Sequence, residues 1–466
     1  METQAIHRSW TRELRSGTML MTSAIIAALG SFLFGFDTAV ISGTTEALRD
    51  LYSLSESMKG FTVSSALIGT LFGAVLVSRP SDWWGRRPVL TVLALLYIVS
   101  AVGCAFAWSW YSLLLFRWIG GIAVGGASVV SPVYITEIAP ARRRGVLVAV
   151  SQLNIVVGIL AAYLSNYLVA YALGAEHPAT WRWMFGIEAA PAAVFLVASF
   201  LIPESPRWLV RKGNRTAAET VLTQFGHESP VREVDEIERS LTSDRLGGRQ
   251  SLFQRKHLRP LLLVGMIAAF NQLDGINAVL YYAADIFRMA GADKAGALMQ
   301  SVIIGLTNLV MTILAMILID RVGRKSLLLA GSVTFILSHA LAAWIFHTHA
   351  QGWIVIVALM GIVGSHAYSQ GAVVWVVINE LLPNTVRASG SAAACFLIWL
   401  LCIGVSWTFP VLVRNSGAPA FAFFAAMMLV QFVLVLKYLP ETKGASLEEL
   451  QERLGAGNRG GSDAGS

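Results

Sequence analysis

The chain has 466 residues, of which 55% are hydrophobic and only 14% are charged, and its mean hydropathy is +0.63. Soluble domains carry about 25% charged residues, so this composition excludes an ordinary soluble domain and favours an integral membrane protein. The formal net charge of +7 would suit a nucleic-acid partner, but the distribution of basic residues among the loops gives it another meaning.

Apolar runs of about 20 residues, the length of a membrane-spanning α-helix, recur throughout the chain. We expect an all-α membrane protein with twelve transmembrane helices at 19–45, 60–78, 88–108, 112–138, 145–170, 181–202, 259–289, 295–319, 325–347, 353–381, 388–412 and 417–439. No A-x-A cleavage site follows the first run, so the charged stretch 1–18 is expected to be a cytoplasmic tail and not a signal peptide.

The basic residues of the short loops are unevenly distributed. One alternate set of loops carries Arg79, Arg86, Arg87, Arg142, Arg143, Arg144, Arg321, Arg324, Lys325 and Arg387. The other set carries Arg49, Lys59, Arg288, Lys294 and Arg414. This positive-inside pattern predicts that both termini are cytoplasmic, so the net charge orients the chain and is not a nucleic-acid footprint. Cys104, Cys395 and Cys402 all lie in apolar runs, so we expect no disulfide framework.

Three motifs occur twice at nearly one spacing. "SDWWGRRP" (81–88) matches "IDRVGRKS" (319–326), with Asp82 and Asp320 238 residues apart. "EIAPARRRG" (137–145) matches "ELLPNTVRASG" (380–390) at an offset of 243, and "IPESP" (202–206) matches "LPETK" (439–443) at an offset of 237. Repeats of this kind indicate two duplicated halves of six helices with the same topology.

The repeat divides the chain into five expected parts. They are an N-terminal tail (1–18), an N-terminal six-helix half (19–202), a cytoplasmic linker (203–258), a C-terminal six-helix half (259–439) and a cytoplasmic C-terminal tail (440–466). In the linker, "AAETVLTQF" and "VDEIERSL" place apolar residues at helical spacing, which predicts short amphipathic helices. The Gly/Ser-rich end, 455–466, is expected to be disordered.

The first apolar run contains a carboxylate. Asp37 lies in "GSFLFGFDTAVISG" (30–43), with no other charge between Met19 and Ile41. An Asp at the centre of a spanning helix costs about 2.5–3.5 kcal/mol, so it needs a partner. The other full charges deep within the first-half spans are Arg117 and Glu188. We expect Arg117 to be the counter-ion and give Glu188 no role.

Taken together, the motifs resemble those of the sugar porter family of the major facilitator superfamily. The resemblance covers nearly the whole chain and depends on the order and spacing of its motifs, which are "GFDTAVISG", "GRRP" with Asp82, "RWIGGIAVGG", "PVYITEIAPARRRG", "PESPRWL", "GINAVLYY", "DRVGRK" and "PETKGASLEEL". It implies that Asp37 carries a proton and that Arg117 modulates it. The alternative is a static ion pair that only sets the register of the helices.

A sugar site needs amides that donate and accept hydrogen bonds, and aromatic faces for stacking. Such side chains within the apolar runs are Gln152, Asn271, Gln272, Asn277, Tyr281, Asn308, Trp375 and Trp399. On a continuous helix Gln272, Asn277 and Tyr281 would lie within about 100° of one another. The resemblance implies sugar contacts for Gln152, Gln272, Asn277, Asn308, Trp375 and Trp399.

The chain departs from the family pattern at several positions. Asp274 stands where a small or apolar residue is usual, and Ile398 where a polar residue is common, which leaves the identity of the sugar open. His339 and His366 also lie within spans, and we expect them to serve in packing or helix contacts.

Charges repeated at the cytoplasmic ends of both halves suit a latch that links the halves when the inner side is closed. The expected gating residues are Asp82, Arg86, Arg87, Glu137, Arg144, Asp320, Arg324, Glu380 and Arg387. Exposed pairs of this kind cost little to break.

The resemblance implies a secondary active transporter that imports a monosaccharide, a pentose or a hexose, with protons by alternating access. A passive sugar uniporter and a proton-coupled transporter of a polyol such as inositol are the alternatives. We expect neither an enzyme nor a metal or cofactor, and only the proton as coupling ion. The expected partners are the sugar and the bilayer, without nucleic acid, for a monomer that spans the inner membrane many times.

Overall fold

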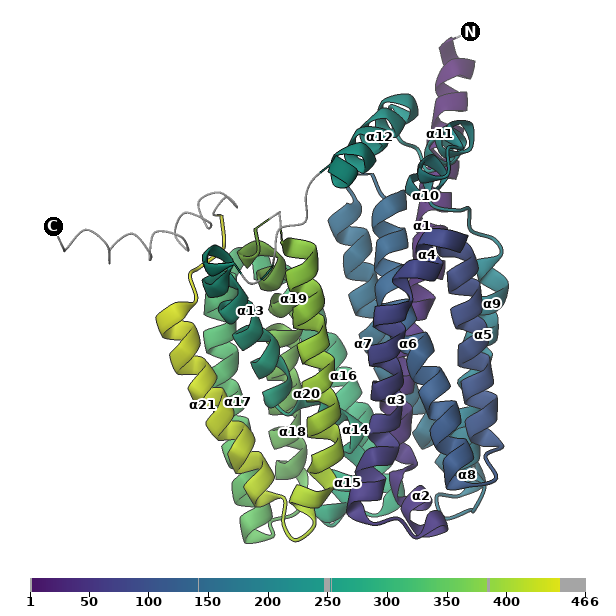
Figure 1. Ribbon diagram of the computed structural model, residues 1–466. Helices are drawn as coiled ribbons and strands as arrows, with labels where there is room; N and C mark the ends of the chain where they lie inside the picture. Colours follow the sequence, from purple (N-terminus) through teal and green to yellow (C-terminus); the bar gives the residue numbers. More distant parts are fainter. Residues whose placement is uncertain (1, 141, 247–251, 253, 384–385, 445–466) are drawn as a thin grey trace, which may run out of the picture. The chain divides into compact units, whose positions relative to one another are not determined.

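The computed structural model describes residues 2–140, 142–246, 252, 254–383 and 386–444, and in this part of the chain every regular element is a helix (Figure 1). Among these residues, eleven helices are long and apolar enough to cross a membrane. The remaining expected span, 181–202, is divided into α8 (Thr180–Gly186) and α9 (Ala189–Ser199). Pro191 follows the division, and a proline lacks the N–H that would continue the helical hydrogen bonds.

The chain forms two compact units. The first contains residues 1–40, 65–165 and 179–248, and the second contains 41–64, 166–178 and 249–466. Their extents differ from the five expected parts, whose boundaries stay a prediction. Two helices, α3 (Glu56–Leu76) and α7 (Arg144–Leu173), run from one unit into the other.

The other helices of the first unit are α1 (Glu2–Val40), α4 (Ser78–Trp84), α5 (Arg86–Ala105), α6 (Trp110–Ile138), α8, α9, α10 (Pro206–Arg211), α11 (Arg215–Gln224) and α12 (Pro230–Leu246). Helix α6 packs against α1 and α5 around an apolar core. A side chain at Gly121 or Gly125 of α6 would collide with backbone carbonyls of α3. The glycine-rich stretch of the apolar run thus permits close helix packing.

The linker helices are confirmed. Ala218, Val221 and Leu222 are buried on α11, and Val234 of α12 completes a small apolar cluster with Ala218 and Leu222. The expected disordered end, 455–466, lies outside the described residues. The three cysteines are free thiols, as predicted.

The remaining helices of the second unit are η1 (Ile41–Gly43), α2 (Thr45–Tyr52), α13 (Arg255–Leu273), α14 (Ile276–Tyr281), α15 (Ala283–Met289), α16 (Lys294–Val322), α17 (Arg324–Thr348), α18 (Trp353–Tyr368), α19 (Gln370–Leu381), α20 (Arg387–Val413) and α21 (Ala418–Tyr438). Two expected spans are broken here: 259–289 forms α13, α14 and α15, and 353–381 forms α18 and α19. Helices α13, α19 and α20 share an apolar core, to which Ile398 belongs.

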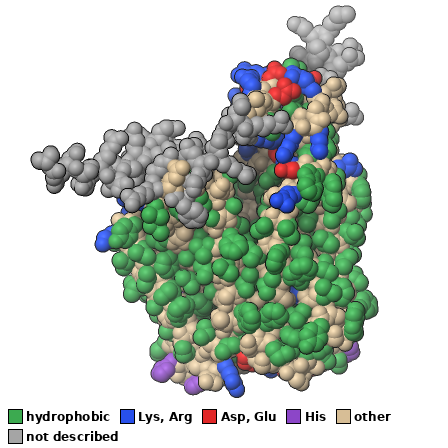
Figure 2. Space-filling view, in the orientation of Figure 1, with side chains coloured by type: hydrophobic (Ala, Val, Ile, Leu, Met, Phe, Trp, Pro, Cys, Tyr) green, Lys and Arg blue, Asp and Glu red, His purple; other side chains and the backbone are tan. Residues whose placement is uncertain are grey.

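The outward-facing sides of the helices are apolar. Figure 2 shows hydrophobic side chains over most of their length, with charged side chains gathered where α11 and α12 lie. Exposed leucines, valines and phenylalanines, such as Leu95, Val197 and Phe200, would be unfavourable in water but suit contact with lipid. This surface agrees with a protein that spans the membrane many times.

Candidate functional site

The predicted ion pair of the first unit is present. Arg117 of α6 donates from Nη1 to Asp37 Oδ1 of α1 at 2.6 Å, and the two residues are 1% and 4% exposed. Gly120, one turn after Arg117, makes room on α6, since a Cβ there would collide with Ser100 Oγ and come within 3.7 Å of Asp37 Oδ1. Asp37 lies near the end of α1 and Arg117 lies within α6, and the long arginine side chain reaches across to the carboxylate.

Glu188, to which the sequence analysis gives no role, belongs to the same interior. It is 2% exposed between α8 and α9, and the Arg117 charge acts on it as well as on Asp37. The Arg117 guanidinium also lies over the Phe185 ring, 5.7 Å from its centroid. One cation and two carboxylates enclosed among apolar side chains are electrically neutral when the group holds one proton. Sequence reasoning could have included Glu188, because a carboxylate in an apolar run needs a partner there.

In the second unit, three predicted sugar-site amides form a row. Asn277 Nδ2 donates to Gln272 Oε1 at 2.6 Å, and Gln272 Nε2 donates to Asn271 Oδ1 at 2.8 Å. All three come from the chain around the break between α13 and α14. The row therefore presents donors and acceptors on adjacent side chains, as hydroxyl recognition requires.

The helical rotation used to align Gln272, Asn277 and Tyr281 is wrong, because the helix is not continuous. It ends at Leu273, and Gly275 adopts φ +75°, a left-handed conformation that favours glycine. The Asp274 carboxylate accepts a hydrogen bond from the Ile276 backbone N–H at 2.9 Å and so closes the turn. The turn, and not the period of one helix, brings Gln272 and Asn277 together.

The other predicted sugar residues lie on different helices. Tyr281 is buried on α14 and forms a side-chain hydrogen bond with Cys402 of α20. Asn308 is buried on α16, Trp375 is 44% exposed on α19, and Trp399 of α20 forms a side-chain hydrogen bond with Cys395. These residues belong to the second unit, whereas Gln152 is half-buried on α7 in the first unit.

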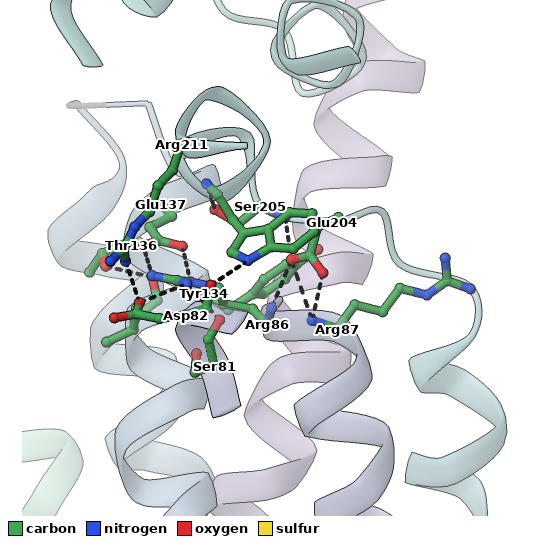
Figure 3. A network of polar contacts seen from close by, with 12 residues as sticks. Ser81, Asp82, Arg86, Arg87, Tyr134, Thr136, Glu137, Glu204, Ser205 and Arg211 are labelled. Carbon is green, nitrogen blue, oxygen red and sulfur yellow. Dashed lines mark hydrogen bonds and ion pairs between the residues drawn. The ribbon is translucent and has the colours of Figure 1, made fainter. Parts of the chain in front are cut away.

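A network of charges orders the loop between α4 and α5 in the first unit (Figure 3). Arg86 donates two hydrogen bonds of 2.8 Å, from Nε and Nη2, to the Glu137 carboxylate of α6. It also forms an ion pair with Asp82 at 3.4 Å. Asp82 also pairs with Arg211 of α10 at 2.7 Å. Bidentate arginine–carboxylate pairs are strong and directional, so the network fixes α4, α6 and α10 to one another.

Glu204 holds the same loop from the other side. Its carboxylate accepts from the backbone N–H of Arg86 at 2.9 Å and of Arg87 at 3.3 Å, just after Gly85, whose φ is +105° (Figure 3). The carboxylate occupies the space that a side chain at Gly85 would need. Burial raises the pKa of Glu204, and the backbone hydrogen bonds oppose this shift.

The second unit repeats this construction. Glu441 accepts from the backbone N–H of Arg324 at 3.0 Å and of Lys325 at 3.1 Å, after Gly323 with φ +98°. Arg324 pairs with Glu380 at 3.4 Å. The three sequence motifs that occur twice therefore build the same loop scaffold twice.

The remaining gating candidates have separate surroundings. Arg87 donates to the Phe200 carbonyl at 2.8 Å, and Arg387 donates to the Leu382 carbonyl at 3.3 Å. Arg144 is exposed at the start of α7. The side chain of Asp320 lies outside the described residues.

Sequence reasoning missed a buried ion pair in the second unit. Lys59 Nζ of α3 lies 2.9 Å from Asp285 Oδ2 of α15, and both side chains are less than 10% exposed. Thr45 donates to Asp285 Oδ1 at 2.9 Å, and Arg288 pairs with Glu46 nearby. The signal was available, because Asp285 falls inside an expected apolar span and needs a partner there.

Comparisons with known proteins agree with this architecture. The model of the family described as "Sugar (and other) transporter" matches residues 23–454. The D-xylose-proton symporter of Escherichia coli is 36% identical over 94% of this chain and 96% of its own length. The arabinose-proton symporter of Bacillus subtilis is also 36% identical, over 95% of this chain and 96% of its own.

Solved structures agree as well. The inward-open xylose transporter of E. coli has a TM-score of 0.83 and 34% identity, over 93% of this chain and 99% of that chain. A structure of the same transporter bound to 6-bromo-6-deoxy-D-glucose, described as a major facilitator superfamily protein, has a TM-score of 0.77. This chain belongs to the sugar transporter family and has the major facilitator fold.

Proposed function

We propose that this membrane protein imports a monosaccharide, a pentose or a hexose, together with protons by alternating access. The observation that carries the proposal is the buried Arg117–Asp37 pair, with Glu188 inside the same apolar interior. The names of the relatives, a D-xylose-proton and an arabinose-proton symporter, support the same coupling and the same class of substrate. Neither of these names points to a passive uniporter or a polyol transporter.

Asp37 carries the coupled proton. While Arg117 donates to it, the carboxylate is stable in its ionised form. When the helices move and Arg117 withdraws, an isolated carboxylate in an apolar interior is costly, and taking up a proton removes that cost. The proton is released when the pair forms again. A static pair would hold the helices together without exchanging a proton.

The sugar binds to the amide and aromatic side chains near the middle of the membrane. The proposed contacts are Gln152, Asn271, Gln272, Asn277, Tyr281, Asn308, Trp375 and Trp399. The row of Asn271, Gln272 and Asn277 supports this proposal because its amides already exchange hydrogen bonds that hydroxyl groups can replace. The partly exposed Trp375 offers a ring face for the C–H side of a sugar.

The charge clusters at the loop ends act as the inner gate. Arg86 and Glu137 pair within the first unit, and Arg324 and Glu380 pair within the second. We place Asp82, Arg87, Arg144, Asp320 and Arg387 in the same gate. These charged loops, and with them both termini, lie on the cytoplasmic side because basic residues favour that side. The protein works as a monomer in the inner membrane, with the proton as its coupling ion.

The test uses purified protein in liposomes that contain a pH-sensitive dye. Pentoses, hexoses and inositol are added outside one at a time, and internal acidification and sugar entry are recorded. We expect one monosaccharide to acidify the interior. Asp37→Asn should abolish this signal and uphill accumulation, while counterflow of the same sugar survives.

Two results would contradict the proposal. Sugar entry without acidification, unchanged in Asp37→Asn, would make the protein a uniporter and Asp37 a structural residue. Acidification by inositol alone would make it a polyol symporter. Asp50→Asn is a matched control, since Asp50 is an exposed carboxylate of α2 whose salt bridge is with its neighbour Arg49.

A further inference from the structure

A second buried carboxylate lies in the second unit, at the break between α13 and α14. Asp274 is 0% exposed, and its side chain makes two bonds in different directions. Oδ1 accepts from the Ile276 backbone N–H at 2.9 Å within the turn, and Oδ2 lies 2.7 Å from His366 Nδ1 of α18. Its carbonyl oxygen lies 2.8 Å from His339 Nε2 of α17. One residue thus ties the break to two other helices.

The aromatic surroundings of His339 hold its contact with the Asp274 carbonyl in place. The imidazole stacks on Phe335, with ring centroids 5.8 Å apart and planes at 7°, and it contacts Phe421 and Phe424 of α21. The Phe424 ring fills the space where a side chain at Gly275 would lie. Displacement of the break would therefore disturb packed aromatic rings, and packed interiors resist such displacement.

His366 is the more accessible of the two histidines that bond to Asp274. Its side chain is 18% exposed, whereas Asp274 is fully buried. It lies near the end of α18, three residues before the interruption at Ser369, beyond which α19 carries Trp375. The hydrogen bond between His366 and Asp274 therefore joins the α13–α14 break, which carries the amide row, to the end of α18, which leads to Trp375 on α19.

We propose that Asp274 and His366 are positioning residues of the sugar site, which set the geometry of the α13–α14 break and through it the affinity for sugar. Gln272 and Asn277 stand on opposite sides of the break, so the turn fixes the distance between their amides. An error of about 1 Å in a positioned group can cost up to 100-fold in function. The inference rests on the proposed function, because it takes these amides as sugar ligands.

The test measures sugar counterflow in liposomes, which needs no proton gradient, and compares KM with the maximal rate. Asp274→Ser retains a short oxygen that can accept from Ile276 N–H but cannot reach His366. His366→Ala removes the partner, and His366→Asn restores a donor near the position of Nδ1. We expect KM to rise about tenfold in Asp274→Ser and His366→Ala, with maximal rates within about twofold of the wild type. His366→Asn should recover most of the affinity.

Two further measurements make the result specific. In the double variant Asp274→Ser/His366→Ala, KM should rise no more than in the single variants, since residues that act through one contact are not additive. The ratio of protons to sugar should stay at the wild-type value in every variant, because Asp37 is untouched. If Asp274→Ser does not fold, the comparison of His366→Ala with His366→Asn decides the question.

The proposal is overturned if KM is unchanged in His366→Ala, if the double variant multiplies the single effects, or if His366→Asn is as impaired as His366→Ala. Gln272→Ala and Asn277→Ala separate this failure from that of the site itself. If those two variants leave KM unchanged, the sugar site is wrongly placed. If they raise KM and His366→Ala does not, the site stands and the positioning role fails.

Discussion

The loops of the two units are built alike, but their interiors are not. In the first unit Glu204 accepts from the backbone N–H groups of Arg86 and Arg87, and in the second Glu441 does the same for Arg324 and Lys325. Arg86 then pairs with Glu137, and Arg324 pairs with Glu380. The same hydrogen-bond pattern thus orders the chain at a helix start in both units.

Inside the helices the resemblance between the units ends. The first unit encloses Asp37, Arg117 and Glu188, whose charges suit proton chemistry. The second unit presents amides at a broken helix, with Asp274 bonded to His366 behind them. The repeated bonds order the loops in both units, whereas the two interiors differ, which fits the proposed proton site in the first unit and the proposed amide row of the sugar site in the second.

Among the variants that test this difference between the two interiors, Arg117→Leu should lose the most stability and transport. Removing the cation leaves two buried carboxylates without a counter-charge, and breaking a buried pair costs about 3–5 kcal/mol. We expect a clear loss of thermal stability in detergent and no uphill accumulation. The double variant Asp37→Asn/Arg117→Leu should regain part of the stability without regaining accumulation. Equal melting temperatures for Arg117→Leu and the wild type would contradict the role of the pair.

A second comparison sets Arg86→Ala against Arg324→Ala. Arg86 makes two 2.8 Å bonds to a Glu137 side chain that is 9% exposed, whereas Arg324 lies 3.4 Å from a Glu380 side chain that is 25% exposed. We expect a loss of about 3 kcal/mol for the first variant and about 1 kcal/mol for the second. Denaturation of both in the same detergent measures the difference. Equal losses would show that the two loops contribute alike.

The smallest expected effect concerns the pH dependence of the first loop. Burial raises the pKa of Glu204 above its ordinary value of 4.5, so the folded protein holds this proton more firmly than the unfolded chain does. The contribution of Glu204 to the free energy of unfolding is therefore complete below pH 4.5, and it is lost as the pH rises through the pKa of the folded state. Relative to Glu204→Gln, the wild type should therefore gain stability between pH 7 and pH 5, by less than about 4 °C in Tm. A relative loss on acidification would contradict this sign.

Much of this molecule follows from local patterns along the chain. Runs of apolar residues predict the spanning helices, because each such helix satisfies its own backbone hydrogen bonds in lipid. Asp37 and Arg117 could be paired in advance, since charges deep in apolar spans are rare and each needs a partner. The repeated motifs predict a duplication, and the loops that they form carry the same bonds in both units.

Other features depend on contacts between residues distant in the chain. The break at Gly275 defeats the helical period that would align Gln272 with Tyr281, and distant residues pack against it, since His339 lies at the Asp274 carbonyl and Phe424 lies beside Gly275. Asp274 meets His366 92 residues away, and Lys59 meets Asp285 across more than 200 residues. Periodicity reports which face of a helix is apolar, but the partner of a buried charge is selected by how the helices pack.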